Sequence, residues 1–592
     1  MNSLRKIILV PGHSLKILGG TILASAFIAH CEAASVSIFK ANDPSRMEVP
    51  DASGRKVSSG DLSGPDGELI DVDKTPRMLD MKEAKPLFSS ATSRPFRVNH
   101  IKLTGVTVYS AEQLRPLYAA LEGKDVTLQQ INSVAAQITH RYRQDGYLLV
   151  KTVIPVQRIN NGLLELHVTE GRINNTNIQG DTNRATERYA ENVRNDVPLT
   201  ATELERNILL MNDLPGNEAQ ATLSPSSEKA GSDLLINNKL KRWDGFLGLD
   251  NRDSRHYGSW QGYGGVNLNN PLDIGDRLSF RYGHSFESNY MAFYEGQYEA
   301  PINRYGTTMS ILYQHNDGYP DTYSFLNANS HGDNIIARLN HPWMRSRMEN
   351  INSSVAFTWY NGTSEYFNDP DNSPSSDDRI RALRVGTSWD FVDSHGGSNL
   401  VKAELSQGLH VMGASHEGRN NPSREGGNTN FTKLQLDLQR LQNLDPIAQG
   451  LAIYMAMSAQ TAFGEALLTP EQFGVGGSQF GRGYDASEIS GDNGIAGKLE
   501  LQYSKLHVIN EYPIPVQYYS FWDLGKVWNN EPRYTDSESL ASLGGGVRIN
   551  PYKDLHITGE VAFPLTRSVA SEEAYGYNGN KARFFLNVLK MF

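Results

Sequence analysis

Two hydrophobic periodicities divide the chain near residue 240. Before that point, apolar residues recur every three or four positions in several stretches, which is the spacing of an amphipathic helix. In the clearest stretch, "TLQQINSVAAQITHRYRQDGY", the apolar positions are Leu128, Ile131, Val134, Ala135, Ile138 and Tyr142. From Trp243 onward apolar and polar residues alternate, as in a β-strand with one apolar face. The pattern predicts an α+β part followed by an all-β part.

Residues 96–172 are predicted to form one α+β module. The strand-like run "FRVNHIKLTGV" is followed by two helical stretches and then by the runs "LLVKTVIPVQRI" and "LLELHVTEGRI". The first helical stretch, "SAEQLRPLYAALEG", has Ser110 as its N-cap and Gly123 as its stop. Residues 173–239 repeat the same β-α-α-β-β order more weakly. We therefore expect two tandem modules, and a single irregular α+β domain is the alternative.

The alternating runs of residues 240–592 predict an all-β transmembrane antiparallel barrel. In "RLSFRYGH", for example, an apolar face alternates with a polar one: Leu278, Phe280 and Tyr282 against Ser279 and Arg281. A sandwich or a propeller would show the same period. The barrel is favoured because the polar face carries charges, as a wet lumen requires, and because short turns alternate with long polar loops such as 368–378 and 415–430. We count about sixteen runs.

The first residues predict a secretory signal peptide over residues 1–33. Two basic residues precede an apolar stretch, and small residues follow it around Ala33. A membrane-spanning helix is the alternative, which Lys16 inside the stretch disfavours. Cys31 is the one cysteine of the sequence, so the exported chain would have no disulfide and no thiolate metal site.

Composition and motifs argue against an enzyme and against a nucleic-acid-binding protein. The formal net charge is −10, whereas nucleic-acid binders usually carry a basic surplus. The sequence contains no Gly-x-Ser-x-Gly elbow, no His-Glu-x-x-His metal motif and no phosphate-binding loop, and its 15 histidines are dispersed. The acidic loop 368–378 has the ligand type of a Ca²⁺ site, but a solvated surface loop is the more common case. We expect no catalytic residue, no metal and no cofactor.

Several segments resemble the two-partner secretion transporters, which export haemolysin-, adhesin- and contact-toxin-type proteins. The resemblance rests on "LGLDNRDSRHYGSWQGYGGVNLNNPLDIGDRLSF" (247–280), "YEAPINRYGTTMSILY" (298–313), "GRGY" (481–484) and "FWDLGKVW" (521–528). It implies that the tandem modules are POTRA domains and that the alternating region is an outer-membrane barrel. The final run, "ARFFLNVLKMF", is similar to the C-terminal assembly signal of such barrels, with Phe592 as its terminal aromatic residue.

Arg482 lies in a glycine-rich loop, and spacing alone favours a solvated charge there and another at Asp523. The family resemblance implies instead that this loop folds into the barrel and that Arg482 meets Asp523, because an arginine fork suits a carboxylate. Strand residues two positions apart share a face, so Phe521 would stack on the guanidinium and Gly525 would leave room for the loop. The lock implied by the resemblance comprises Arg482, Gly483, Tyr484, Phe521, Asp523 and Gly525.

The resemblance also implies an outer-membrane pore for a large unfolded secreted partner: an adhesin, a cytolysin or a contact-dependent inhibition toxin. Edge strands of the POTRA-like modules, within 96–239, would bind this partner in the periplasm. Other expected partners are outer-membrane lipid and the barrel-assembly machinery, through the C-terminal strand; no nucleic acid is expected. Residues 34–95 would supply a linker and the family's N-terminal plug helix. The alternatives are a barrel-assembly insertase of the same superfamily and a passive porin.

Overall fold

The structure, a computed structural model, describes residues 95–592 with short gaps, and before residue 95 only the paired strands β1 (Val49–Pro50) and β2 (Lys56–Val57). The gaps are 227–230, 255–256, 287–290, 321–327, 366–375, 417–420, 510–511, 533, 535, 553, 567–568 and 570–580. The predicted signal peptide and plug helix lie outside the described residues. The chain forms an α+β unit, which ends at Arg242 and includes Asn269–Asp276, and a barrel unit, which includes Trp243–Leu268 and Arg277–Phe592.

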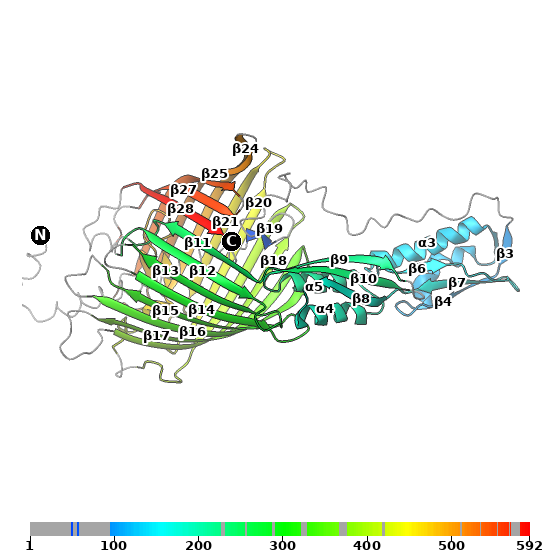
Figure 1. Cartoon of the computed structure of the whole chain (residues 1–592), viewed down its shortest axis with the longest axis horizontal. Helices are drawn as coiled ribbons and strands as arrows, with labels where there is room; N and C mark the ends of the chain where they lie inside the picture. The colour runs from blue at the N-terminus through cyan, green and yellow to red at the C-terminus, as the bar shows by residue number, and fades with distance from the viewer. Residues whose placement is uncertain are drawn as a thin grey trace, which may run out of the picture. The chain divides into compact units, whose positions relative to one another are not determined.

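The first module of the α+β unit packs helix α3 (Leu128–Gln144) on a three-stranded sheet (Figure 1). Thr127 caps α3 through a reciprocal capping box with Gln130, and the predicted apolar face of the helix is buried. The sheet has the order β4–β7–β6, with β4 parallel and β6 antiparallel to β7. The other elements are β3 (Phe96–Val98), β4 (His100–Thr104), α2 (Ala111–Leu114), η3 (Arg115–Leu117), η4 (Ala119–Leu121), β5 (Lys124–Val126), β6 (Lys151–Val153) and β7 (Leu163–Thr169).

The first helix of this module is shorter than the sequence predicts. Ser110 does cap α2, through a capping box with Gln113, but α2 ends after four residues and 3₁₀ turns replace it. Pro116 lies in the first of these turns. Proline has no N–H to donate and its ring crowds the preceding turn, so a regular helix cannot continue through it.

The second module repeats the predicted order with a different sequence. Its helices α4 (Arg184–Asn195) and α5 (Ala201–Asn212) are capped by Asn183 and Thr200, and both bury an apolar face. Its sheet has the order β8–β10–β9, with β10 parallel to β8 and antiparallel to β9. The strands are β8 (Ile173–Gly180), β9 (Asn217–Pro225) and β10 (Ser232–Leu240). Strands β8 and β9 therefore form the two edges of this sheet.

The barrel unit is a closed antiparallel barrel of 16 strands, which confirms the predicted fold (Figure 1). Pairing of β11 with β28 closes the sheet, and next to it the backbones of Phe592 and Gly245 exchange hydrogen bonds. A closed barrel satisfies its backbone groups without an exposed edge. The strands are β11 (Trp243–Asp250), β12 (Gln261–Asn269), β13 (Arg277–Ser285), β14 (Met291–Pro301), β15 (Thr308–Gly318), β16 (Asn329–Arg345), β17 (Glu349–Glu365), β18 (Ser376–Val392), β19 (Gly397–Gly408), β20 (Thr432–Asn443), β21 (Leu451–Thr461), β24 (Asn493–Ile509), β25 (Tyr512–Trp528), β26 (Ser537–Tyr552), β27 (Leu555–Pro564) and β28 (Arg583–Met591).

Alternation along each strand separates an outward apolar face from an inward polar one. In β13, Leu278 and Phe280 are exposed on the outside of the barrel, whereas Ser279 and Arg281 are buried inside it. Apolar side chains on the outside suit lipid, and charges on the inside suit a polar lumen. Separately, no helix among the described residues is both long enough and apolar enough to cross a membrane.

Short and long connections lie at opposite ends of the barrel, because antiparallel strands turn at alternate ends. The β16–β17 and β18–β19 turns, 346–348 and 393–396, are short, whereas the β19–β20 and β21–β24 connections, 409–431 and 462–492, are long. One predicted loop is corrected: 368–378 includes strand residues, because β18 already begins at Ser376. Asp378 is buried there and accepts a hydrogen bond from the backbone of another loop.

Candidate functional site inside the barrel

Residues 462–492, here called the inserted segment, fold into the barrel. The segment contains a 3₁₀ turn, η6 (Thr469–Glu471), and a two-stranded ribbon of β22 (Phe473–Val475) and β23 (Ile489–Gly491). Its buried apolar side chains pack on inward-facing residues of the barrel wall: Phe473, Val475, Tyr484 and Ile489 against Ala496, Val527 and Leu540. The glycine-rich stretch between the two ribbon strands forms the tip, so the tip lies against the wall.

The backbone of the tip is shaped to present Arg482. Gly481 has a φ of 84°, in the left-handed region that glycine adopts at little cost. The N–H groups of Gly481 and Arg482 both donate to Asp523 Oδ2, at 3.2 and 3.0 Å. The tip therefore offers backbone donors and a side-chain cation to the same carboxylate.

Arg482 and Asp523 form a bidentate ion pair. Arg482 Nε donates to Asp523 Oδ2 at 2.9 Å, and Nη2 donates to Oδ1 at 2.8 Å. Arg482 is 3% exposed and Asp523 is fully buried, on the inward face of β25. Both charges are thus removed from water but are paired and hydrogen-bonded, as a buried ion pair requires. The structure brings these two predicted residues together.

The four other predicted residues surround this pair. The guanidinium carbon of Arg482 lies 3.5 Å from the centre of the Phe521 ring, a cation–π contact. A Cβ on Gly525 would lie 2.5 Å from Val475 Cγ1 in the inserted segment, and a Cβ on Gly483 would lie 2.9 Å from the backbone nitrogen of Pro564. The Tyr484 hydroxyl lies 3.3 Å from the carbonyl oxygens of Ala541 and Thr566, and it accepts the Thr566 N–H at 3.1 Å.

Two glutamates that the sequence reasoning missed complete the surroundings of Arg482. Its Nη1 donates to Glu500 Oε2 at 2.8 Å and lies 3.5 Å from Glu560 Oε2. Glu500 lies on β24 and Glu560 on β27, and both are buried. Arg482 therefore connects three wall strands, β24, β25 and β27. The sequence signal for these residues was their position on the polar face of a barrel strand, because a carboxylate that is buried there needs a cation nearby.

Two more arginines balance the two glutamates. Arg548 Nη1 donates to Glu500 Oε1 at 2.7 Å, and its guanidinium lies 3.9 Å from the centre of the Tyr519 ring. Arg252 Nη2 donates to Glu560 Oε1 at 2.8 Å. Together with the Arg482–Asp523 pair, the cluster has three carboxylates and three guanidinium groups, so its formal charges cancel. We call these six residues the tip network: Arg252, Arg482, Glu500, Asp523, Arg548 and Glu560.

A separate ion pair holds the beginning of the inserted segment. Glu471 in η6 receives Arg384 Nη2 at 2.6 Å and Lys433 Nζ at 2.7 Å. Arg384 lies on β18 and Lys433 on β20, which precede β21 in the strand order, whereas the tip-network strands β24, β25 and β27 follow β21. The segment is therefore tied to wall strands on both sides of its own connection between β21 and β24. Among the described residues, no group of three or more His, Cys, Asp or Glu side chains could hold a metal ion.

The sequence matches two family models. The model described as haemolysin secretion/activation protein ShlB/FhaC/HecB matches residues 230–549. The model described as POTRA domain, ShlB-type, matches residues 96–171. The first match covers most of the barrel and the second covers the first α+β module.

Individual proteins and solved structures are similar over nearly the whole chain. The "Heme/hemopexin transporter protein HuxB" of Haemophilus influenzae (strain 86-028NP) is 24% identical over 561 residues, covering 90% of this chain and 95% of the relative. The "Outer membrane transporter CdiB" of Dickeya dadantii (strain 3937) is 24% identical over 492 residues, covering 81% and 83%. The solved structure of CdiB from Escherichia coli superposes with a TM-score of 0.71 and 18% identity, covering 96% of this chain and 98% of that one, so the fold is shared.

Proposed function

Because the chain belongs to the haemolysin secretion/activation protein family ShlB/FhaC/HecB, we propose that a secreted partner protein crosses the outer membrane through its barrel when the inserted segment moves. The chain is an outer-membrane transporter for secreted partner proteins, with POTRA modules in the periplasm. Membership of this family favours an exporter over the two alternatives, a barrel-assembly insertase and a passive porin.

The tip network is the observation that carries this proposal. The inserted segment packs against the inner face of the wall, so in this proposal it moves before a polypeptide passes. Buried ion pairs contribute little net stability, because desolvation offsets their attraction, but they fix position. When the segment leaves the wall, Arg482 and Asp523 can regain hydration from a wet lumen. A charged network therefore suits a segment that has to be held in register and still be released.

The test is a secretion assay in cells that supply the cognate partner. We expect Arg482→Ala and Asp523→Ala to abolish export, because the segment is then no longer held in the register from which it is released. The barrel should still insert, which is checked by comparing its gel mobility with and without boiling. Lys526→Ala is the matched control, because Lys526 is exposed on the outward face of the same strand as Asp523. Normal export by both lock variants would rule out the lock.

We also propose that the partner docks on the α+β unit by adding a strand to a sheet edge. Strands β8 and β9 have 8 and 9 residues, whereas the edge strand β6 has only 3, so the second module offers longer rows of backbone donors and acceptors. Deletion of residues 96–239 should stop export and leave a conducting barrel. Export at the normal level after this deletion would reject the docking role.

The remaining proposed partners are those of an outer-membrane barrel. Lipid would contact the outward apolar face, and the barrel-assembly machinery would contact β28 and Phe592. Deletion of Phe592 removes its hydrogen bonds to Gly245 and should lower the amount of assembled barrel. An unchanged amount would argue against a role for Phe592 in assembly. For the cargo we propose a large exoprotein, either of the three predicted classes or, from the name of the HuxB relative, one that acts on heme or hemopexin.

A further inference from the structure

Arg424 is a buried charge in a loop that the topology places outside the cell. The α+β unit precedes β11 and is periplasmic, so the β19–β20 connection, 409–431, lies at the extracellular end of the barrel. Its described residues omit 417–420. Arg424 is nevertheless 1% exposed, and it is among the largest fully buried side chains of the described residues. An arginine on a surface loop normally keeps its charge in water, so this burial needs a reason.

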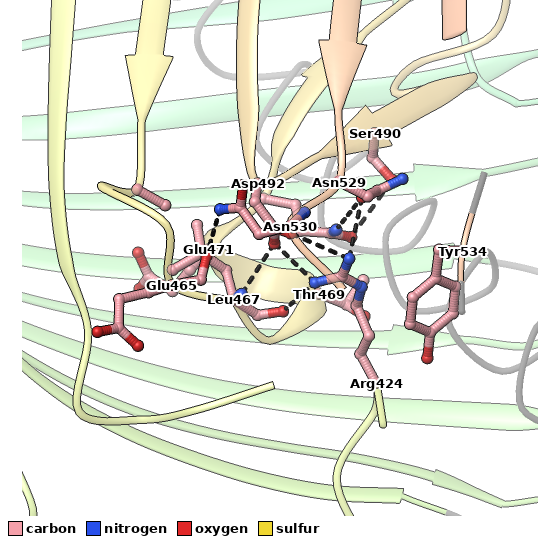
Figure 2. Close-up of polar contacts among 12 residues, drawn as sticks. Arg424, Glu465, Leu467, Thr469, Glu471, Ser490, Asp492, Asn529, Asn530 and Tyr534 are labelled. Atoms are coloured by element: carbon pink, nitrogen blue, oxygen red, sulfur yellow. Dashed lines mark hydrogen bonds and ion pairs between the residues drawn. The ribbon is translucent and has the colours of Figure 1, made fainter. Parts of the chain in front are cut away.

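The partner of Arg424 is Asp492, the last residue of the inserted segment (Figure 2). Arg424 Nη1 donates to Asp492 Oδ1 at 2.6 Å, and Nη2 donates to Oδ2 at 3.1 Å. The same guanidinium donates to the Leu467 carbonyl and to Asn529 Oδ1, each at 3.0 Å. Its carbon lies 4.5 Å from the centre of the Tyr534 ring.

These contacts join the two roots of the inserted segment, the places where it leaves and re-enters the wall. Leu467 follows β21, and Asp492 directly precedes β24. Asp492 also accepts the backbone N–H of Leu467 at 2.8 Å and that of Asn530 at 2.7 Å. One ion pair, Arg424–Asp492, therefore ties together the 409–431 loop, both roots of the segment and the β25–β26 loop, 529–536.

Backbone contacts lay the 409–431 loop along the first root. The Asn428 N–H donates to the Ala466 carbonyl at 2.9 Å, and the Thr469 N–H donates to Ser423 Oγ at 3.2 Å. The Glu425 N–H donates to the Tyr534 hydroxyl at 3.0 Å. Gly427 lies so close to the root that a Cβ there would be 2.8 Å from Leu468 Cδ2. Residues 423–428 of the loop thus cover the root.

We propose that Arg424 is the clasp of the extracellular mouth: it holds residues 423–428 over the roots of the inserted segment at rest, and it must release before a partner protein can emerge. The clasp is distinct from the tip network, because the two share no residue. Removing Arg424 leaves Asp492 buried without its cation, which favours the open, hydrated arrangement. The second half of the proposal, release during export, rests on the proposed route through the lumen.

The closed state is tested without cargo, by adding protease to intact cells and measuring how fast the 409–431 loop is cut. We expect Arg424→Ala to be cut at least about tenfold faster than the wild type, because a buried ion pair that has lost one partner is strongly destabilised. Arg424→Lys keeps the charge but loses the fork, so it should be intermediate. Arg379→Ala is the matched control, because Arg379 is half exposed on neighbouring β18 and pairs with Asp377, two positions away on the same strand. Equal cutting rates for Arg424→Ala and the wild type would overturn the clasp.

Release is tested by locking the loop to the root with the double substitution Gly427→Cys and Leu468→Cys. Cys31 is the one cysteine of the sequence and lies in the predicted signal peptide, so the pair has no competing thiol. We expect export to stop when the pair is oxidised and to recover when reductant is added, which also shows that the variant is folded. Export by the oxidised protein at the wild-type level would show that the loop does not move during secretion. If Arg424→Ala is cut faster but the oxidised cysteine pair still exports normally, then Arg424 holds the loop closed at rest, but the loop is not released during export.

Discussion

At Gly525 the wall strand β25 and the inserted segment meet without room for another atom. A Cβ at this position would lie 2.5 Å from Val475 Cγ1, and valine is too stiff to move its methyl group away cheaply. We therefore expect Gly525→Ala to displace the segment from its seat. Overpacking of this kind typically costs about 1–3 kcal/mol, so export measured with the cognate partner should fall about tenfold.

Gly497→Ala is the control for this prediction. Gly497 lies on the neighbouring strand β24, and a Cβ there would have only the Ala456 carbonyl, at 3.8 Å, within reach. This variant should export normally, and both variants should assemble to the same level. If Gly525→Ala exports as well as Gly497→Ala, the contact with Val475 does not position the segment.

Single residues show where sequence reasoning stops. The Arg482–Asp523 pair was predicted because two short motifs, 481–484 and 521–528, resemble motifs of the two-partner secretion transporters. Glu500 and Glu560 lie on the polar faces of their strands, but which cation meets them depends on the tilt and register of a closed barrel. Arg424 belongs to a loop without a periodic pattern, and its partner is 68 positions away, so no local signal connects them.

At the scale of elements, periodicity predicted helices and strands well wherever one face is buried. Helices α3, α4 and α5 each have an apolar face at helical spacing, and the barrel strands alternate. Two of the errors occurred at prolines: Pro116 ends α2 early, and β6 ends at Val153, shortly before Pro155. The sequence pattern predicted a longer helix and a longer strand that continued past these prolines, which have no backbone N–H to donate.

Glu170 ties the elements of the first module together and makes this module sensitive to acid. It follows β7 and accepts the backbone N–H groups of Thr107 and Val108, at 2.8 and 3.1 Å, and the Tyr142 hydroxyl of α3, at 2.6 Å. Burial alone would raise the pKa of Glu170, but hydrogen bonds from Thr107 and Tyr142 outweigh it and hold the pKa below its ordinary value. Its contribution to stability is therefore present above the unfolded-state pKa, about 4.3, and is lost as the pH falls through the folded-state pKa.

We expect Glu170→Gln to lower the unfolding temperature of the α+β unit by about 5 °C at pH 7, because hydrogen bonds to a charged group are worth about 1.5–3 kcal/mol. The difference from the wild type should shrink below the unfolded-state pKa. Circular dichroism of the helices measures this in the intact protein, because every α-helix among the described residues lies in the α+β unit. The exposed Glu218 on β9 provides the control Glu218→Gln. A difference that is the same at pH 7 and in acid would contradict the role of the Glu170 charge.

For the whole molecule, counting alternating runs predicted about sixteen strands, and the charged polar face and the alternation of short and long connections favoured a barrel over a sandwich or a propeller. The position of the inserted segment in the lumen could not be predicted from the alternating pattern. Strand β21 pairs with β24 directly, so β22 and β23 are an excursion from the wall, and their position depends on contacts with strands far along the chain. The family resemblance implied an inward loop, but its attachment at the roots emerged only in three dimensions.

The inserted segment is held at its tip by Arg482 and at its roots by Arg424, and this arrangement makes a prediction about the entire barrel. While either attachment remains, the segment still crosses the lumen, so Arg482→Ala and Arg424→Ala should each raise the frequency of open events in a planar bilayer only in part. The double variant should raise it by about the product of the two single effects, because both attachments must break before the segment moves and their free energies add. Single-channel recordings of equally assembled proteins measure all three. A double effect no larger than the larger single effect would mean that one attachment alone holds the segment, and the two would not restrain the same movement.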